Sequence, residues 1–411
     1  MLNGDMVRGR DFIIVGQQPW DTEIGSNCKN IALELSRSNR VLYVNSALDR
    51  ISLLRGKNDA KVQKRLAVIK GKQDGIELIQ ENLWTYYPDC LIESINWIKS
   101  KAVFNLLNKR NNRLFARSIK QAVSKLGFAN TILFNDNDMF RSFYLKEMLK
   151  PDLSIYYSRD FMLAVDYWKY HGTDLEPALI AKSDICMANS TYLANYCRQY
   201  NPCSYYVGQG CDLDMFSGYT GTEAPGDMVN IPRPVIGYVG ALQSIRLDIE
   251  LLGYIATQRP EWSIVLVGPE DNEFKKSSLH AVKNIYFLGG KDPSLLPAYI
   301  DVFDVCLNPQ IVNQVTIGNY PRKIDEYLAM GKPVVATATE AMSIFSEYTY
   351  LAVTRDDYLE LIERALKENS SELQSDRRVF ASSHTWANNV TEIYRAINDF
   401  NTKKQNNGGT H

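Results

Sequence analysis

The feature that most constrains this 411-residue chain is an alternation of short apolar runs with amphipathic segments, which occurs in two series. Runs typical of buried strands in the first series lie at residues 12–15, 41–44, 131–134, 154–157, 185–188 and 204–207. In the second series they begin at residues 235, 263, 285, 305 and 333, with helical patterns near 247–257, 294–302 and 322–330. Strand–helix–strand order implies parallel sheets with right-handed crossovers.

A turn-rich break at residues 220–227, followed by an extended Ile231-Pro-Arg-Pro segment, separates the two series. We therefore predict an α/β protein with two Rossmann-like domains, residues 1–230 and 231–384, and a ligand site in the cleft between them. A helix near 385–400 is expected to pack back on the first domain. The polar tail from Asn401 is expected to be frayed.

Composition excludes several classes of protein. Apolar residues make up 45% and charged residues 23% of the chain, which excludes a disordered chain, collagen and a coiled-coil rod. We find no apolar run of membrane-spanning length and no signal-peptide core before Asp11, so we expect a cytoplasmic protein. Seven cysteines without a CxxC pair and four histidines without HExxH predict neither disulfides nor a metal site.

Charge is distributed unevenly along the chain. Residues 1–150 hold 24 Lys and Arg against 15 Asp and Glu, a net +9, and the remainder must therefore carry −10. The segment 97–126 has eight basic residues, no acidic ones and interleaved apolar residues, which predicts a pair of basic amphipathic helices. Such a pair suits peripheral contact with an anionic membrane, although a solvated basic face is an alternative. No recognised motif points to nucleic acid.

The most informative motif lies at residues 319–337. Pro321 suits the first turn of a helix, Gly331 suits its C-terminal end, and Pro333 stops it before a buried strand. Lys323 and Glu326 share one helical face near the N-terminus, where a diphosphate would be favoured and Glu326 could accept hydrogen bonds from a ribose diol. A surface ion pair on an ordinary helix is the alternative.

Residues 321–336 read Pro-Arg-Lys-Ile-Asp-Glu-Tyr-Leu-Ala-Met-Gly-Lys-Pro-Val-Val-Ala. This closely resembles the donor-binding signature Pro-x-Lys-x-x-Glu-Tyr-Leu-Ala-x-Gly-Lys-Pro-Val-Val-Ala of GT-B glycosyltransferases of family 4. The resemblance extends over 235–340 and is nearest to the subgroup that makes teichuronic acid and other surface polysaccharides. It implies a GT-B fold, a nucleotide-diphosphate sugar as donor substrate, no tightly bound cofactor and a glycan or lipid-diphosphate-linked acceptor.

The resemblance also implies site residues. Glu326 matches the second glutamate of the family's Glu-x7-Glu motif, whereas Gly318 stands in place of the first. Lys323 and Arg246 are expected to stabilise the leaving diphosphate, and Arg246 could instead pair with Asp248 or Glu250. The remaining residues expected around the donor are Gly240, Gly268, Gly289, Thr316 and Asn319.

In the N-terminal domain, residues 16–29 occupy the place of the family's glycine-containing acceptor loop. The residues expected on the acceptor side are Trp20, Gly25, Ser26 and Asn27. Family members often have a histidine after a mid-domain strand, but Asn135-Asp-Asn-Asp stands there. Asp136, Asp138 or Asp160 could take a catalytic carboxylate role, although aspartates at strand ends are also common turn formers.

These features predict a glycosyltransferase that moves a hexose-type sugar from a UDP- or GDP-sugar to a glycan or lipid-linked glycan, with retention of the anomeric configuration. Two alternatives remain. One is an enzyme of the UDP-sugar 2-epimerase type on the same fold, and the other is a non-catalytic sugar-nucleotide or glycan-binding protein, which the missing motif glutamate suggests.

Overall fold

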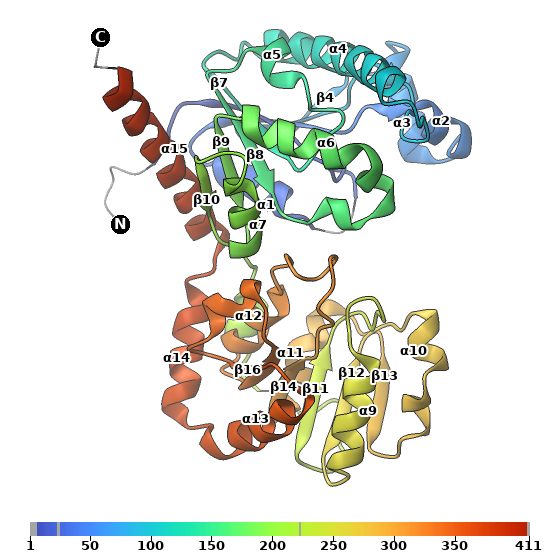
Figure 1. Cartoon of the computed structure of the whole chain (residues 1–411), viewed down its shortest axis with the longest axis vertical. Coiled ribbons are helices and arrows are strands. Elements are labelled where there is room, and N and C mark those ends of the chain that lie inside the picture. Colours follow the sequence, from blue (N-terminus) through green and yellow to red (C-terminus); the bar gives the residue numbers. More distant parts are fainter. Residues whose placement is uncertain (1–5, 23–24, 222, 409–411) are drawn as a thin grey trace. The chain divides into compact units, whose positions relative to one another are not determined.

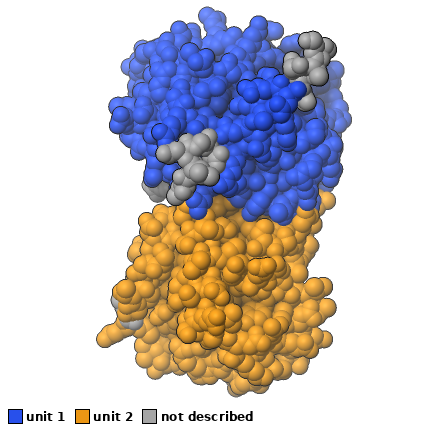
Figure 2. All heavy atoms as spheres, turned by 90° about the vertical axis from the view of Figure 1, so that its left-hand side faces the viewer, with its two compact units in different colours: residues 1–208, 386–411 blue, residues 209–385 orange. Residues whose placement is uncertain are grey.

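A computed structural model describes residues 6–22, 25–221 and 223–408 of the chain. It divides into two compact units, coloured separately in Figure 2: unit 1 is Met1–Gly208 with Trp386–His411, and unit 2 is Gln209–Thr385. Residues 1–5 and 409–411 lie outside the described residues. They belong to the N-terminal segment in which we predict no signal peptide and to the tail that we predict is frayed.

Unit 1 is built on a mainly parallel sheet with the order β10-β9-β8-β7-β1-β2-β5-β4, in which only β4 and β5 pair antiparallel. Its strands are β1 (Asp11–Val15), β2 (Arg40–Val44), β4 (Ile76–Gln80), β5 (Leu83–Tyr86), β7 (Thr131–Asp136), β8 (Leu153–Ser158), β9 (Ile185–Ala188) and β10 (Ser204–Tyr206). A separate short pair consists of β3 (Leu48–Asp49) and β6 (Leu91–Ile92). Its helices are α1 (Asn27–Leu35), α2 (Arg50–Arg55), α3 (Ala60–Ile69), α4 (Lys101–Lys125), α5 (Leu145–Leu149), the 3-10 helix η1 (Met162–Ala164), α6 (Asp166–Lys182), α7 (Thr191–Arg198) and α15 (Trp386–Gly408).

The central strand β1 of unit 1 is buried on both faces of the sheet. Alternate residues of β1 enter different cores, because successive strand side chains point to opposite faces. Phe12 and Ile14 pack in a core that contains residues of α1 and α15, whereas Ile13 and Val15 pack in one that contains residues of α4. Figure 1 shows α15, in red, as the last helix of the chain.

Unit 2 contains a parallel sheet with the order β13-β12-β11-β14-β15-β16. Its strands are β11 (Val235–Val239), β12 (Ser263–Val267), β13 (Ile285–Gly289), β14 (Val305–Asn308), β15 (Val334–Thr337) and β16 (Tyr350–Ala352). Its helices are α8 (Asp214–Ser217), α9 (Ile249–Gln258), α10 (Asn272–Lys276), η2 (Ser278–Ala281), η3 (Pro293–Leu295), α11 (Leu296–Val302), α12 (Arg322–Ala329), α13 (Arg355–Glu368), η4 (Glu340–Phe345) and α14 (Ser371–Ser382). This strand order is that of a Rossmann fold, with the reversal between β11 and β14.

Two close contacts hold α11 and α12 on the sheet of unit 2. A Cβ atom at Gly237 would lie 2.2 Å from the ring of Phe303, so only glycine lets that ring pack on β11. The fully buried Tyr327 of α12 accepts a 2.8 Å hydrogen bond from the Val239 N–H through its hydroxyl. These contacts fix α12 against the end of β11.

The structure confirms the predicted strands and the two Rossmann-like α/β halves. Three predictions need correction. Unit 2 begins at Gln209 rather than at residue 231, because Cys211, Leu213, Phe216 and Met228 pack in its core. The basic segment 97–126 forms one long helix, α4, rather than a pair. The tail is helical as far as Gly408.

Candidate functional site

The motif residues of unit 2 lie around the point where its strand order reverses. In parallel α/β sheets, ligands bind beyond the carboxyl ends of the strands at this switch point. The loops that follow β11 and β14 are joined there by backbone hydrogen bonds: the Asp248 N–H donates to Pro309 O at 2.9 Å, and the Ile311 N–H donates to Arg246 O at 2.9 Å. The loop after β14 leads directly into α12.

Gly240 and Gly268 follow β11 and β12 and lie against each other. A Cβ atom at Gly268, where φ is 156°, would lie 1.9 Å from Gly240 O, so no side chain fits there. At Gly240, where φ is 139°, a Cβ atom would lie 3.3 Å from Cε of Lys323. Gly268 therefore serves the close approach of two strand ends, whereas Gly240 keeps space beside the motif lysine.

Lys323 lies in the first turn of α12. Its Nζ is 4.9 Å from the centre of the Tyr238 ring, a cation–π contact with the strand that ends at Gly240. No side chain caps the start of α12, which follows Pro321; this proline is the N-cap residue rather than the first helical residue. The site therefore combines a lysine with an uncapped helix N-terminus, an arrangement that favours anions.

Glu326 is half-buried one turn further along the same face of α12. Its carboxylate forms no hydrogen bond with the part of the chain that the structure describes. Burial raises its pKa above the ordinary value, an effect that nearby Arg322 and Lys323 oppose and Asp325 reinforces. A carboxylate that is poorly solvated and lacks partners is a strong acceptor for ligand hydroxyls.

Arg246 is exposed on the loop after β11, and its guanidinium forms no ion pair among the described residues. The two carboxylates considered as its partners are occupied elsewhere. Asp248 accepts the Leu251 N–H at the start of α9, and Glu250 pairs with Arg355 at 2.7 Å. Arg246 is therefore available to an anionic ligand.

Three other expected donor residues differ in what they offer. Thr316 is fully buried, and its hydroxyl donates to Ile311 O and accepts the Asn313 N–H, so its side chain closes the loop. Asn319 is half-buried, and its N–H donates to Thr316 O at 3.0 Å. Gly289 ends the edge strand β13 with φ 69°, and nothing described lies within 4 Å of a Cβ atom there.

Sequence reasoning did not find a polar cluster on the other side of α12. Asp325, which is completely buried, lies 2.6 Å from Nδ1 of His384 and accepts a 3.3 Å contact from the Cys211 thiol. His384 is far away in the sequence, so no local pattern signals this pairing. The cluster ties α12 to the segments at both ends of unit 2.

The acceptor-loop residues of unit 1 lie around its own switch point, between β1 and β7. Trp20 is half-buried. Its ring packs edge-on against Tyr43, with 5.0 Å between the ring centres, and its backbone N–H donates to Asn45 Oδ1 at 2.7 Å. Ser26 caps α1 by accepting the Lys29 N–H, Asn27 is the first residue of that helix, and Gly25 is exposed. Residues 23–24 of this loop lie outside the described part.

The three aspartates of unit 1 have different surroundings. Asp138 is buried and accepts the Phe140 N–H, the Arg141 N–H and Arg141 Nε at 2.7–3.1 Å, so it forms a turn rather than facing a ligand. Asp136 is fully buried against Arg159 at 2.8 Å. Asp160 pairs with the same arginine at 2.9 Å and is half-exposed, which makes it the more accessible carboxylate.

Within residues 6–22, 25–221 and 223–408, no group of three or more His, Cys, Asp and Glu side chains is placed to hold a metal ion. The chemistry that the arrangement of unit 2 offers is recognition of an anionic ligand that also carries hydroxyl groups. Lys323 and Arg246 supply the positive charge, and Glu326 supplies the acceptor.

Comparison with known proteins shows what unit 2 and the whole fold are similar to. Residues 233–368 match the family model of the glycosyl transferases group 1. Over 189 residues, the chain is 28% identical to a Bacillus subtilis protein, TuaH, described as a teichuronic acid biosynthesis glycosyltransferase. That alignment covers 44% of this chain and 47% of TuaH, so it spans about half of the relative.

Solved structures show the fold over nearly the whole chain. A sucrose-phosphate synthase from Thermosynechococcus elongatus superposes with a TM-score of 0.62 at 15% identity, covering 98% of this chain and 100% of that one. HepE from Anabaena, solved in complex with UDP, gives 0.63 at 12% identity and covers 95% and 100%. Trehalose 6-phosphate synthase from Burkholderia multivorans gives 0.65 at 11%, covering 97% and 99%. The fold is that of the GT-B glycosyltransferases.

Proposed function

We propose that this chain, whose residues 233–368 form a group 1 glycosyl transferase domain, transfers a sugar from a UDP- or GDP-sugar to a glycan or lipid-linked glycan. The observation that carries the proposal is the carboxylate of Glu326, which has no hydrogen-bond partner among the described residues and lies one helical turn from Lys323 at the switch point of unit 2. From the resemblance of the motif around these residues, we also propose that the enzyme belongs to family 4 and retains the anomeric configuration. Likeness to TuaH supports a role in surface polysaccharide biosynthesis.

The donor would be held by unit 2 in a defined orientation. Its diphosphate lies at the start of α12 against Lys323 and Arg246, and its ribose hydroxyls donate to Glu326. As the glycosidic bond breaks, negative charge grows on the leaving diphosphate, and these cations stabilise it. HepE from Anabaena has been solved with UDP-glucose, which supports a UDP-sugar as the first donor to test.

The acceptor side is assigned to unit 1. We propose that the loop with Trp20, Gly25, Ser26 and Asn27 borders the acceptor, and that Asp160 is the carboxylate of unit 1 that takes part in the reaction. Asp138 is a weaker candidate, because Arg141 and two backbone N–H groups already occupy it.

We also propose that the enzyme works in the cytoplasm at the inner face of the membrane, held there by α4. Lys109, Arg113, Arg117 and Lys120 of this helix are exposed, and Leu106 is 72% exposed. None of the described helices is both long and apolar enough to cross a membrane. Sedimentation with anionic and with neutral lipid vesicles tests this proposal. We expect the protein to sediment with the anionic vesicles and to remain in solution with the neutral ones.

The decisive functional test is incubation with UDP- and GDP-sugars, with and without lipid-diphosphate glycans. A glycosyltransferase releases nucleoside diphosphate in proportion to an elongated acceptor. A 2-epimerase would instead release free epimer without an acceptor. Donor binding with neither product would support the non-catalytic alternative and contradict the proposal.

A further inference from the structure

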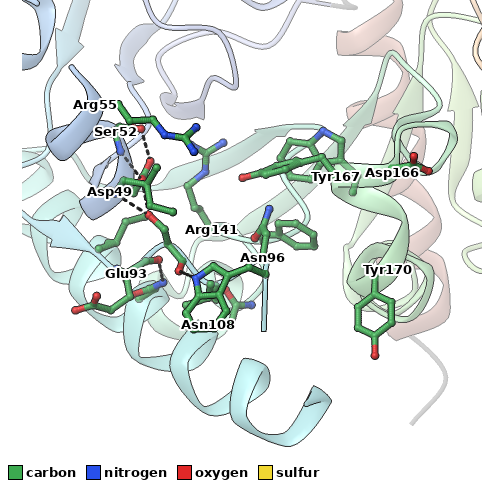
Figure 3. Close-up of a pocket in the computed structure, with 18 residues that line it drawn as sticks. Asp49, Ser52, Arg55, Glu93, Asn96, Asn108, Arg141, Asp166, Tyr167 and Tyr170 are labelled. Carbon is green, nitrogen blue, oxygen red and sulfur yellow. Dashed lines mark hydrogen bonds between the residues drawn. The ribbon is translucent and has the colours of Figure 1, made fainter. Parts of the chain in front are cut away.

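Unit 1 contains a cavity of about 590 Å³ that none of the expected donor or acceptor-side residues lines. Figure 3 shows the side chains around it. They come from β3 and α2, from residues 92–97, from α4, from the segment after β7 and from the start of α6. The volume lies within the range of small-ligand sites, roughly 300–1,000 Å³.

Aromatic rings line this cavity and remain open to solvent. Trp97, Tyr167 and Tyr170 are 72%, 61% and 54% exposed, a high degree of exposure for large rings. Two of them are held in position: Trp97 Nε1 donates to Ser94 O at 2.8 Å, and the Tyr170 hydroxyl donates to Lys99 O at 2.9 Å. Fixed, exposed rings with a polar edge offer flat surfaces on which the apolar C–H face of a sugar can stack.

Two arginines, Arg55 and Arg141, are the basic residues among those that line the cavity. In Figure 3 the guanidinium groups of Arg55 and Arg141 point toward each other. Arg55 forms no hydrogen bond or ion pair with the described residues. Arg141 uses Nε to bind Asp138, and no protein partner is found for its terminal nitrogens in the same part of the chain. Two guanidinium groups facing each other favour an anionic group between them, and carboxylate and phosphate both suit guanidinium geometry.

Three acidic residues also line the cavity, and they differ in how far each offsets the charge of the two arginines: Asp49, Glu93 and Asp166. Burial alone would raise the pKa of Asp49, but hydrogen bonds from Ser94 and Ser52 together outweigh burial and hold that pKa below its ordinary value. Glu93 pairs with Arg50 at 2.7 Å and with Arg110 at 3.5 Å. Asp166 lies on the far side of Tyr167 in Figure 3.

A buried amide adds a hydrogen-bonding group without a partner. Asn108 of α4 lines the cavity and is 2% exposed, and its Nδ2 finds no acceptor among the described residues. An unpaired buried donor is costly, and a ligand hydroxyl or an ordered water that entered the cavity would relieve that cost.

We propose that this cavity binds a saccharide that bears a carboxylate or phosphate group, with the anion between Arg55 and Arg141 and the sugar ring against Trp97 or Tyr167. The inference rests on the proposed glycosyltransferase function, because the saccharide would be a part of the acceptor that extends beyond the loop with Trp20, Gly25, Ser26 and Asn27. It adds the substrate class, which is an anionic saccharide rather than a neutral one.

Binding without donor tests the inference directly. Saturation-transfer NMR and calorimetric titration would use glucuronic acid, glucose 6-phosphate and glucose as probes with the full chain. We expect both anionic sugars, or one of them, to bind at least five-fold more tightly than glucose, and the stronger of the two identifies carboxylate or phosphate as the anion. Equal binding of all three, or no binding at millimolar concentration, would overturn the inference.

Substitutions of residues that line the cavity test whether the saccharide binds there. Arg55→Gln should reduce affinity for the anionic sugar by about five- to ten-fold, and Trp97→Ala should weaken anionic and neutral sugars alike. Arg37→Gln, which removes an exposed arginine just after α1 that does not line the cavity, is the matched control and should leave saccharide affinity unchanged. Equal affinity of Arg55→Gln and the control would contradict the assignment.

The outcomes separate this inference from the proposed function. Saccharide binding that depends on Arg55, in a protein that transfers no sugar, would support the cavity and contradict the glycosyltransferase. Sugar transfer with an acceptor KM that is unchanged in both Arg55→Gln and Trp97→Ala would support the enzyme and contradict the cavity as its acceptor site.

Discussion

Two adjacent carboxylates of α12 have opposite surroundings. Asp325 is fully buried and paired with His384, whereas Glu326 is half-buried and without a described partner. Consecutive helical residues point about 100° apart, so one faces the interior and the other faces the switch point. Asp325 therefore ties α12 to His384, whereas we propose that Glu326 binds a ligand.

Lys323 should recognise phosphate rather than base or sugar. Charge-assisted hydrogen bonds to phosphate contribute about 1.5–3 kcal/mol. We therefore expect Lys323→Ala to weaken UDP or GDP binding by about ten-fold or more and to leave the weaker binding of the nucleoside nearly unchanged. Calorimetry checks this, with Lys367→Ala on the exposed face of α13 as the control. An equal loss for nucleoside and nucleotide would indicate a general structural effect instead.

Glu176 should make stability depend on pH. Burial raises its pKa from 4.5 to about 7, although Tyr156 donates to it at 2.6 Å and Tyr196 at 3.3 Å. Because the folded pKa is raised, the folded state retains the proton while the unfolded state loses it, and stability falls as pH rises from about 4.5 to 7. Glu176→Gln should remove this fall, so thermal melting at pH 5, 6, 7 and 8 should show the variant gaining on the wild type as pH rises. A constant difference at all four values would contradict the assignment.

For single residues, the sequence patterns indicated which positions to consider better than they indicated what each side chain does. The motif marked Lys323 and Glu326, but nothing local distinguishes a carboxylate that forms a turn from one that faces a ligand. Asp138 and Thr316 proved to be occupied by bonds within their own loops. The sequence contains no pattern that predicts the hydrogen bonds of Asp138 or Thr316, because these bonds depend on the conformation of each loop.

The end of α12 follows a recognisable hydrogen-bond pattern. The Gly331 N–H donates to Leu328 O at 2.8 Å, and the Lys332 N–H donates to Tyr327 O at 3.0 Å, which together form a Schellman motif. Gly331 has φ 74°, as the motif requires, and Pro333 then leads into β15. The sequence predicted this end correctly because glycine and proline act locally.

Gly331→Ala should therefore destabilise unit 2. A side chain in the left-handed region costs about 1–2 kcal/mol, and the new Cβ would also lie 2.9 Å from the guanidinium of Arg378. We expect a lower thermal midpoint for the unit 2 transition in differential scanning calorimetry. Gly226→Ala, where φ is not in that region and nothing described lies within 4 Å, is the control and should have little effect. An equal midpoint in both variants would show that the turn tolerates a side chain.

Elements with strong apolar patterns were predicted, and those with mixed patterns were missed. The strands β4 and β5 form an antiparallel edge that the sequence did not reveal, because β4 is largely exposed and lacks an apolar run. Segment 97–126 was expected to form two helices, yet residues 101–125 contain no glycine or proline to end the first one. The length of α4 follows from that absence.

At the scale of the whole chain, the units do not follow the order of the sequence. The last helix, α15, belongs to unit 1, where Val390, Ile393, Tyr394 and Ile397 are at most 3% exposed. Residues 209–219 belong to unit 2 although they precede the turn-rich break at residues 220–227. Composition marked that break, but packing determines where each unit ends.

Removal of residues 386–411 should therefore affect one unit more than the other. Large-to-small changes at single buried apolar residues cost about 2–5 kcal/mol, so loss of the whole buried face of α15 should unfold unit 1 or lower its melting temperature sharply. Unit 2 has separate cores, and its thermal transition should persist and still rise when UDP or GDP is added. If the nucleotide effect disappeared with α15, the donor could not be bound by unit 2 alone.

The most direct test of the central claim is calorimetric titration of UDP and GDP into the wild type, Glu326→Gln and Glu360→Gln. Glu360 lies on the exposed face of α13 and provides a matched substitution away from the site. Bonds from ribose hydroxyls to a carboxylate contribute about 1.5–3 kcal/mol, so we predict that one nucleotide binds the wild type and the control equally and binds Glu326→Gln about ten-fold more weakly. Equal affinity in all three proteins would contradict the assignment of the donor site to α12.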